Sequence, residues 1–98
     1  MKLMVTWQMH PGKLHETLKR FSNMTPESER SLAGERIRFI GRWHDLARGR
    51  GVAIYEAETA EDFARYSLAW NDVMDLDVAV VLDDAETRAL GQRLSRPE

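Results

Sequence analysis

The order in which strand and helix patterns follow one another is the feature that most constrains the fold of this chain. Apolar and β-branched residues predict strands over residues 2–9, 37–45, 51–57 and 78–82. Helical spacing of Leu14, Leu18 and Phe21 predicts a helix after the first strand, and a second long helix precedes the last strand. This β-α-β-β-α-β order predicts the ferredoxin-like α+β fold, in which two helices cover one face of a four-stranded antiparallel sheet.

Capping signals set the expected starts of the helices. Pro11 suits the first position of the first helix, with His10 near its N-cap. Thr59 precedes an acidic residue, Asp62, by three positions, as is typical at the start of a helix. The buried stripe of this second long helix is expected to contain Phe63, Ser67, Trp70 and Met74.

Residues 22–35 leave two alternatives open. Thr25 and Pro26 are followed by acidic residues, which is a good helix start, and a short helix ending near Gly34 is one interpretation. A mobile loop is the other interpretation.

The last strand and the segment after it have a different character. Residues 78–82 form an uninterrupted apolar run, as expected of a strand that is covered on both faces. Asp83 or Asp84 would cap an extra C-terminal helix that continues to about Leu94, and residues 96–98 end the chain.

Composition excludes several classes of protein. A chain of 98 residues is predicted to form a single domain over residues 1–98, and its net charge of −2 argues against nucleic-acid binding. The absence of cysteine excludes disulfides and thiol nucleophiles, and it is compatible with a cytoplasmic location, which we expect. No signal peptide and no membrane-spanning run is recognised, so no membrane partner is expected.

The sheet face without helices is expected to be covered by a second copy of the chain. Strand alternation predicts that this face carries Arg38, Ile40, Arg42 and His44. If His44 lies opposite Val52, the same face also receives Ile54 and Glu56. Apolar and ionisable residues mixed in this way favour a semi-enclosed cavity, which two packed sheets would form, and a homodimer is therefore predicted.

Four stretches of the sequence resemble a small bacterial family of unknown function within the dimeric α/β-barrel superfamily. These are LMVTWQMHPG, GRWHDLARGRG, IYEAETAEDFARY and LAWNDVMDLDVAVVLDDAE, and the resemblance extends from Met1 to about Leu94. Residues 22–36 depart from it, because they are longer than the short connection expected there. The resemblance implies a homodimer whose two sheets form a shared barrel, and its relatives include cofactor-free monooxygenases, haem-degrading enzymes and lactone isomerases. It does not imply one activity.

His44 is the candidate catalytic residue, because a histidine on a cavity face can transfer protons near neutral pH. The alternative is a structural histidine that hydrogen-bonds across the dimer. Arg42 and Glu56 are predicted to bind substrate or to form a pair that fixes the dimer.

Three further residues are candidates for contact with substrate. Trp7 and Trp70 would shape a pocket, although both also suit core packing. Asn71 would orient a polar group of the substrate, or else cap the C-terminus of the helix. The spacing of His10 and His15 matches no metal-ligand pair, and neither a metal nor a cofactor is predicted.

The sequence thus leads to two hypotheses of function. The first is a homodimeric domain that binds a small apolar or aromatic molecule. In its strongest form, this hypothesis makes the protein a cofactor-independent enzyme with monooxygenase-like or isomerase-like acid–base chemistry. The second is a non-catalytic module for dimerisation or ligand sensing. A closed cavity of substrate size would favour the first hypothesis, and a space filled by side chains would favour the second.

Overall fold

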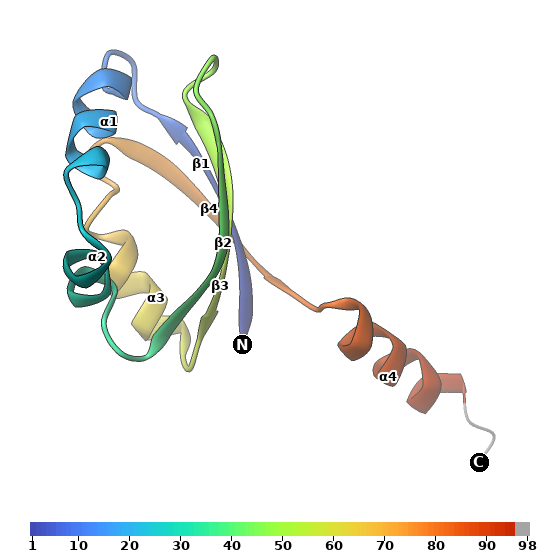
Figure 1. Ribbon diagram of the computed structural model, residues 1–98. Coiled ribbons are helices and arrows are strands. Elements are labelled where there is room, and N and C mark those ends of the chain that lie inside the picture. The colour runs from blue at the N-terminus through green and yellow to red at the C-terminus, as the bar shows by residue number, and fades with distance from the viewer. Residues whose placement is uncertain (96–98) are drawn as a thin grey trace.

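The computed structural model describes residues 1–95 and contains one four-stranded antiparallel sheet (Figure 1). Its strands are β1 (Lys2–Met9), β2 (Ile37–Asp45), β3 (Arg50–Ala57) and β4 (Met74–Val81). They pair in the order β2-β3-β1-β4. This is the ferredoxin-like order that the sequence predicts. The predicted C-terminal residues 96–98 lie outside the described part of the chain.

Three helices lie on one face of the sheet: α1 (Leu14–Ser22), α2 (Pro26–Ala33) and α3 (Ala60–Ser67) (Figure 1). Of the two alternatives for residues 22–35, the helix is therefore the one observed. It starts with a capping box at Thr25 and a proline in its first turn. Thr59 caps α3 through Asp62, as predicted.

Two expected helix boundaries are wrong. Lys13 rather than His10 is the N-cap of α1, because residues 10–12 form a turn in which Gly12 has a φ of 77°. The second long helix ends at Ser67, so that Trp70 and Met74 follow it instead of belonging to its stripe.

The last strand also differs from the prediction. β4 is an edge strand, and its residues Val78 and Val80 remain 48% and 67% exposed. Its apolar run is therefore not covered on both faces within the chain. Because solvated apolar residues are common singly but rarely contiguous, this run indicates incomplete cover.

The core lies between the sheet and the helices. The buried apolar residues come from β1, β3, α3 and the segment after α3, and they are Leu3, Val5, Ala53, Tyr55, Ala57, Phe63, Tyr66, Trp70, Val73 and Met74. The buried carboxylate of Asp62 closes one end of this core. It accepts a hydrogen bond of 2.9 Å from Arg36, which holds its pKa below the ordinary value and ties the start of β2 to α3.

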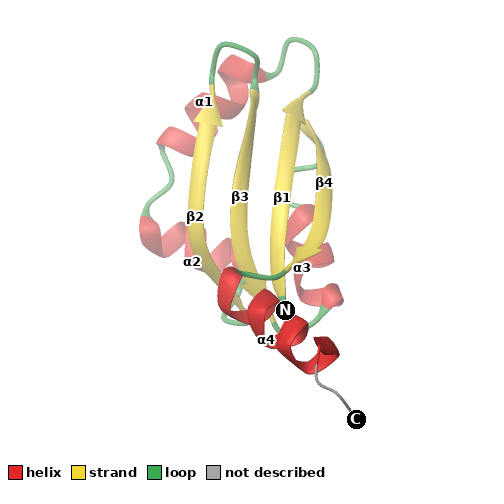
Figure 2. Cartoon of the chain, turned by 90° about the vertical axis from the view of Figure 1, so that its right-hand side faces the viewer, coloured by secondary structure: helices red, strands yellow, loops and turns green. Residues whose placement is uncertain are grey.

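The C-terminal helix α4 (Asp84–Ser95) projects from the side of the sheet that the other helices leave open (Figure 2). It buries none of its residues, and it is tied to β1 by ion pairs of Lys2 with Asp83 at 3.1 Å and with Glu86 at 3.0 Å. The radius of gyration is 16.0 Å, whereas a compact chain of this length has about 13 Å. An α-helix with exposed Leu90 and Leu94 is thus extended away from its own domain.

An irregularity in β2 decides which side chains face the helices. Phe39 pairs with Tyr55, but Gly41 pairs with the very next residue of β3, Ile54, so β2 contains one extra residue. Such a β-bulge inverts the alternation of side chains beyond it. Arg42 and His44 therefore lie opposite Ala53 and Gly51, on the face that the helices cover.

Candidate functional site

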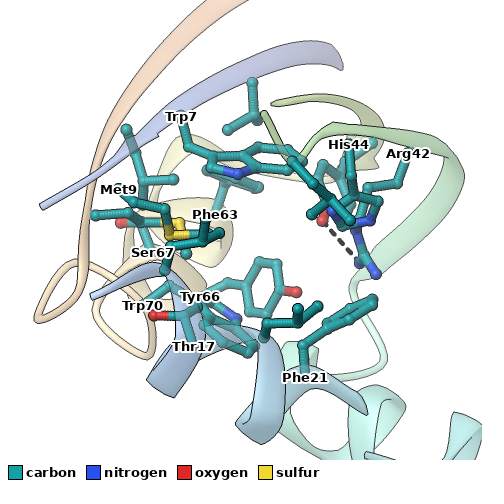
Figure 3. A pocket seen from close by; sticks show the side chains of 17 residues that line it. Trp7, Met9, Thr17, Phe21, Arg42, His44, Phe63, Tyr66, Ser67 and Trp70 are labelled. Carbon is teal, nitrogen blue, oxygen red and sulfur yellow. Dashed lines mark hydrogen bonds between the residues drawn. The ribbon is translucent and has the colours of Figure 1, made fainter. Parts of the chain in front are cut away.

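A cavity of about 80 Å³ opens between the sheet and helices α1 and α3 (Figure 3). Its wall is mostly apolar and aromatic, with Trp7, Phe21, Phe63 and Trp70 as its largest rings. The other lining residues are Val5, Met9, Leu14, Thr17, Leu18, Arg42, His44, Leu46, Tyr55, Tyr66, Ser67, Met74 and Leu76. An apolar wall with a few polar groups is the usual character of a small-molecule site.

Gly51 makes room for the ring of Trp7. The two residues are cross-strand partners, and a Cβ atom on Gly51 would overlap Trp7 Cζ2 and lie 2.6 Å from the carbonyl oxygen of Trp43. The indole can therefore cross β3 and reach His44 on β2, where the two ring centroids are 5.5 Å apart. The glycine at the end of the GRWHDLARGRG stretch is thus needed for close packing in the wall of the cavity.

Arg42 brings a positive charge to the rim of this apolar space. Its side chain is only 11% exposed, and its guanidinium lies 5.1 Å from the ring centroid of Phe21 and 4.7 Å from that of Phe39. Nη2 donates a hydrogen bond of 3.0 Å to the hydroxyl of Tyr55 and another one to the carboxylate of Glu29 in α2. Burial opposes the charge, but these two partners offset it and raise the pKa of Arg42.

His44 stands beside Arg42, with its ring between Trp7 and Phe21 (Figure 3). Partial burial, together with the nearby charge of Arg42, lowers the pKa of His44 below its ordinary value. Within residues 1–95, neither ring nitrogen has a side-chain or backbone hydrogen-bond partner. The lowered pKa favours the neutral imidazole, which is exposed and borders the cavity, and this suits a proton acceptor or a hydrogen-bonding group for a ligand.

Burial also raises the pKa of Tyr66, which keeps this phenol neutral. Thr17 and Ser67 donate their hydroxyl protons to backbone carbonyl oxygens, those of Lys13 and Ala64. The lining residues include no aspartate and no glutamate. The ionisable groups with a shifted pKa that line the cavity are thus Arg42, His44 and Tyr66.

Four of the six predicted site residues, Trp7, Arg42, His44 and Trp70, line this one cavity. The face assigned to His44 and Arg42 is nevertheless wrong. They do not lie on the uncovered face, because the bulge in β2 reverses the alternation on which that prediction rested. The cavity is therefore formed by the sheet and helices of one chain, and not by two sheets.

The other two predicted site residues lie elsewhere. Glu56 is on the open face, where Arg38 donates a hydrogen bond of 3.1 Å to it and Lys2 lies 3.6 Å away, so it forms no pair with Arg42. These two cations lower the pKa of Glu56. Asn71 is exposed and does not line the cavity. It does not cap α3 either, since the C-cap of that helix is Leu68.

Sequence reasoning missed several residues of the site. Phe21 and Tyr55 were recognised as part of a helix stripe and of a strand, but not as wall residues. Thr17 is the buried residue of α1, although it lies between the apolar positions that define its stripe. Glu29 could not be found from spacing, because its contact with Arg42 depends on how α2 folds back over the sheet.

The uncovered face of the sheet carries a second set of apolar residues. Trp43 is 61% exposed and Met4 is 37% exposed, and Val52 and Ile54 between them are half-buried. Cross-strand pairing joins them, because Val52 lies opposite Trp43 and Ile54 lies opposite Met4. We call these four residues the open-face patch.

The sequence matches the family model for a domain of unknown function, DUF3303, over residues 1–95. The chain belongs to the DUF3303 family. No match is found among curated proteins. None of the described helices is long and apolar enough to cross a membrane.

Solved structures of similar chain trace have low sequence identity to this DUF3303 protein. An L-rhamnose mutarotase from Formosa agariphila has 10% identity and a TM-score of 0.47, with 85% of this chain and 94% of that chain covered. A NIPSNAP family protein from Agrobacterium tumefaciens has 12% identity and a TM-score of 0.48, with 86% and 96% covered. A NIPSNAP domain protein from Burkholderia xenovorans has 14% identity and a TM-score of 0.48, with 86% and 97% covered.

Proposed function

We propose that this DUF3303 protein is a homodimeric domain that binds a small apolar or aromatic molecule in the cavity between its sheet and helices. The observation that carries this proposal is the position of His44, whose exposed imidazole borders an aromatic cavity between the rings of Trp7 and Phe21. A ligand would place its apolar part against Trp7, Phe21 and Trp70 and a polar group near His44. A reaction in this site would use His44 for proton transfer, because its neutral form is an acceptor at pH 7.

The size of the cavity limits the ligand. Its 80 Å³ is less than the roughly 300–1,000 Å³ of common ligand pockets, and an engineered protein cavity of about 150 Å³ holds benzene. One ring or a short chain is therefore the upper limit of the proposed ligand, and its polar end would stay outside, at the mouth of the cavity. The same small volume favours the alternative, a non-catalytic module whose cavity stays empty.

The homodimer is proposed on the open-face patch and on α4. A helix with no buried residue and an apolar patch on the same side of the sheet both gain cover if a second copy packs there. The cytoplasmic location expected from the lack of cysteine belongs to the same proposal.

Two measurements test the proposed function. Single-ring probes such as phenol and benzyl alcohol are titrated while tryptophan fluorescence is followed, because Trp7 and Trp70 lie in the wall. We expect saturable binding that His44→Ala weakens several-fold, with an unchanged melting temperature, since removal of His44 strands no hydrogen-bond partner. A dimer that binds no probe would support the non-catalytic module instead.

Sedimentation tests the dimer separately. At micromolar concentration the mass is expected to be twice the chain mass of 11.3 kDa. A compact monomer would contradict this part of the proposal and leave the binding site standing.

A further inference from the structure

The charge on Arg42 is paired with a carboxylate that the protein can release. Glu29 comes from α2, a helix of eight residues that buries none of them, and the Glu29 side chain is 31% exposed. Arg42 itself is 11% exposed and fixed between two aromatic rings and Tyr55. The carboxylate of Glu29 is therefore easier to displace than the guanidinium of Arg42, which packing holds in place.

The guanidinium of Arg42 also has hydrogen-bond donors that no group within residues 1–95 accepts. Both of its side-chain hydrogen bonds use Nη2, and within residues 1–95 Nε and Nη1 have no hydrogen-bond partner. A guanidinium presents its donors as a planar fork, which binds a carboxylate through two parallel bonds. Arg42 can therefore hold a carboxylate more completely than Glu29 does.

The space next to this charge is apolar. Trp7, Phe21 and His44 surround the rim of the cavity near Arg42, and no acidic side chain lines the wall (Figure 3). A molecule with an apolar ring and an anionic end matches both parts. Its ring would occupy the aromatic cavity, and its anionic group would pair with the guanidinium of Arg42. Such a pair is favourable because a buried charge without a partner costs free energy.

We propose that the ligand is a small monocarboxylate with one ring or a short chain, whose carboxylate replaces that of Glu29 on Arg42 and so releases α2. This inference rests on the proposed function, since it names the class of ligand for the same cavity. Glu29 acts as a built-in competitor that keeps the buried guanidinium paired while the cavity is empty. Binding then couples to the position of α2, which buries none of its residues.

The test compares phenylacetate with its neutral isostere phenylacetamide on the full chain, by calorimetric titration. We expect phenylacetate to bind about tenfold more tightly than phenylacetamide, which corresponds to one charge-assisted pair. Glu29→Gln is expected to tighten phenylacetate binding about three- to tenfold and to leave phenylacetamide binding unchanged, because it removes the competitor alone.

Matched variants control for loss of structure and of general charge. Arg42→Gln is expected to abolish the preference for phenylacetate, whereas Arg38→Gln, which removes a β2 arginine from the open face, is expected to keep it. Glu27→Gln removes an exposed charge from α2 and is expected to change neither affinity. Arg42→Gln also removes a buried ion pair and can prevent folding. In that case the effect of Glu29→Gln on phenylacetate binding decides the test.

Hydrogen exchange adds a readout of the release of α2. Phenylacetate is expected to speed amide exchange in residues 26–33, and phenylacetamide is not. Equal affinity for both probes, or no effect of Glu29→Gln, would overturn the carboxylate class and leave the proposed binding site standing. Failure of both probes to bind would overturn the binding site, and this inference with it.

Discussion

Each face of the sheet presents an indole ring over a glycine, and the two faces differ in what surrounds that pair. On the covered face, Trp7 crosses Gly51 and becomes part of a cavity wall closed by α1 and α3. On the open face, Trp43 lies over Gly41, with its Cη2 atom 2.6 Å from where a Cβ on the glycine would be, and it stays 61% exposed. Two similar local arrangements thus have different cover within one chain.

The comparison shows that the chain covers the centre of one of its two apolar surfaces and leaves the other surface open. Tyr66 packs edge to face against Tyr55 and Phe63 on the covered side, and the three ring centroids are 5.4–5.7 Å apart. The open-face patch has no such cover within residues 1–95, and α4 projects away from the sheet (Figure 1). Stability should therefore depend mainly on the covered face, and association mainly on the open one.

The largest expected effect is on the covered face. Phe63→Ala removes a ring that is 4% exposed and should lower the free energy of unfolding by about 3–5 kcal/mol. Leu18→Ala is the matched change on the cavity side of α1, where Leu18 is 38% exposed, and it should cost about 1 kcal/mol. Urea denaturation measures both, and equal losses would contradict the difference in burial.

The two glycines offer the second test. Gly51→Ala places a methyl group against Trp7 and the backbone of Trp43, which cannot move aside, and should cost about 3 kcal/mol. Gly41→Ala meets only the far end of an exposed indole, which can rotate away, and should stay within about 1 kcal/mol of the wild type. The melting temperatures of the two variants should differ clearly, and similar melting temperatures would contradict the packing role of Gly51.

The third test concerns the open face alone. Trp43→Asp puts a charge into the open-face patch and should shift the sedimentation equilibrium toward monomer by about tenfold or more in dissociation constant. Leu68→Asp changes the C-cap residue of α3, which is 69% exposed, and should leave the equilibrium unchanged. Variants with equal masses in solution would exclude the patch as the interface.

The smallest effect is a pH dependence. The pKa of His44 is lowered in the folded state, so between about pH 6.5 and the lower folded value the unfolded chain binds the proton first. Folding stability should therefore fall as pH decreases through this range. The His44→Gln variant should lose less stability than the wild type between pH 7.5 and 5.5 in urea titrations, and equal losses would remove His44 as the cause.

The strands, the capped starts of α2 and α3 and the ferredoxin-like order could be predicted because each depends on local residue types. Thr25 and Thr59 cap their helices where the sequence indicates. The face of His44 could not be derived from alternation, since one extra residue in β2 inverts it. Gly41 was the available signal, because a glycine within a strand often marks a bulge.

The environment of β4 was mispredicted for a different reason. A run of apolar residues indicates that cover is needed, but it does not say whether the cover comes from the same chain. Val78 and Val80 show that here the chain does not supply it. The pairing of Arg42 with Glu29 could likewise not be predicted from the sequence. The two residues are 13 positions apart, and only tertiary packing brings them together.

The bulge in β2 has an evolutionary consequence. If β2 kept its length and lost the bulge, Ile40 would pair with Ile54, and Arg42 and His44 would then turn outward while Trp43 turned toward the helices. A slip of the β2 register by one residue could thus exchange the chemistry of the cavity with that of the outer surface, without a change in any side chain. Relatives whose β2 has the same length but no bulge should therefore differ in ligand and in assembly together, even where their sequence is alike.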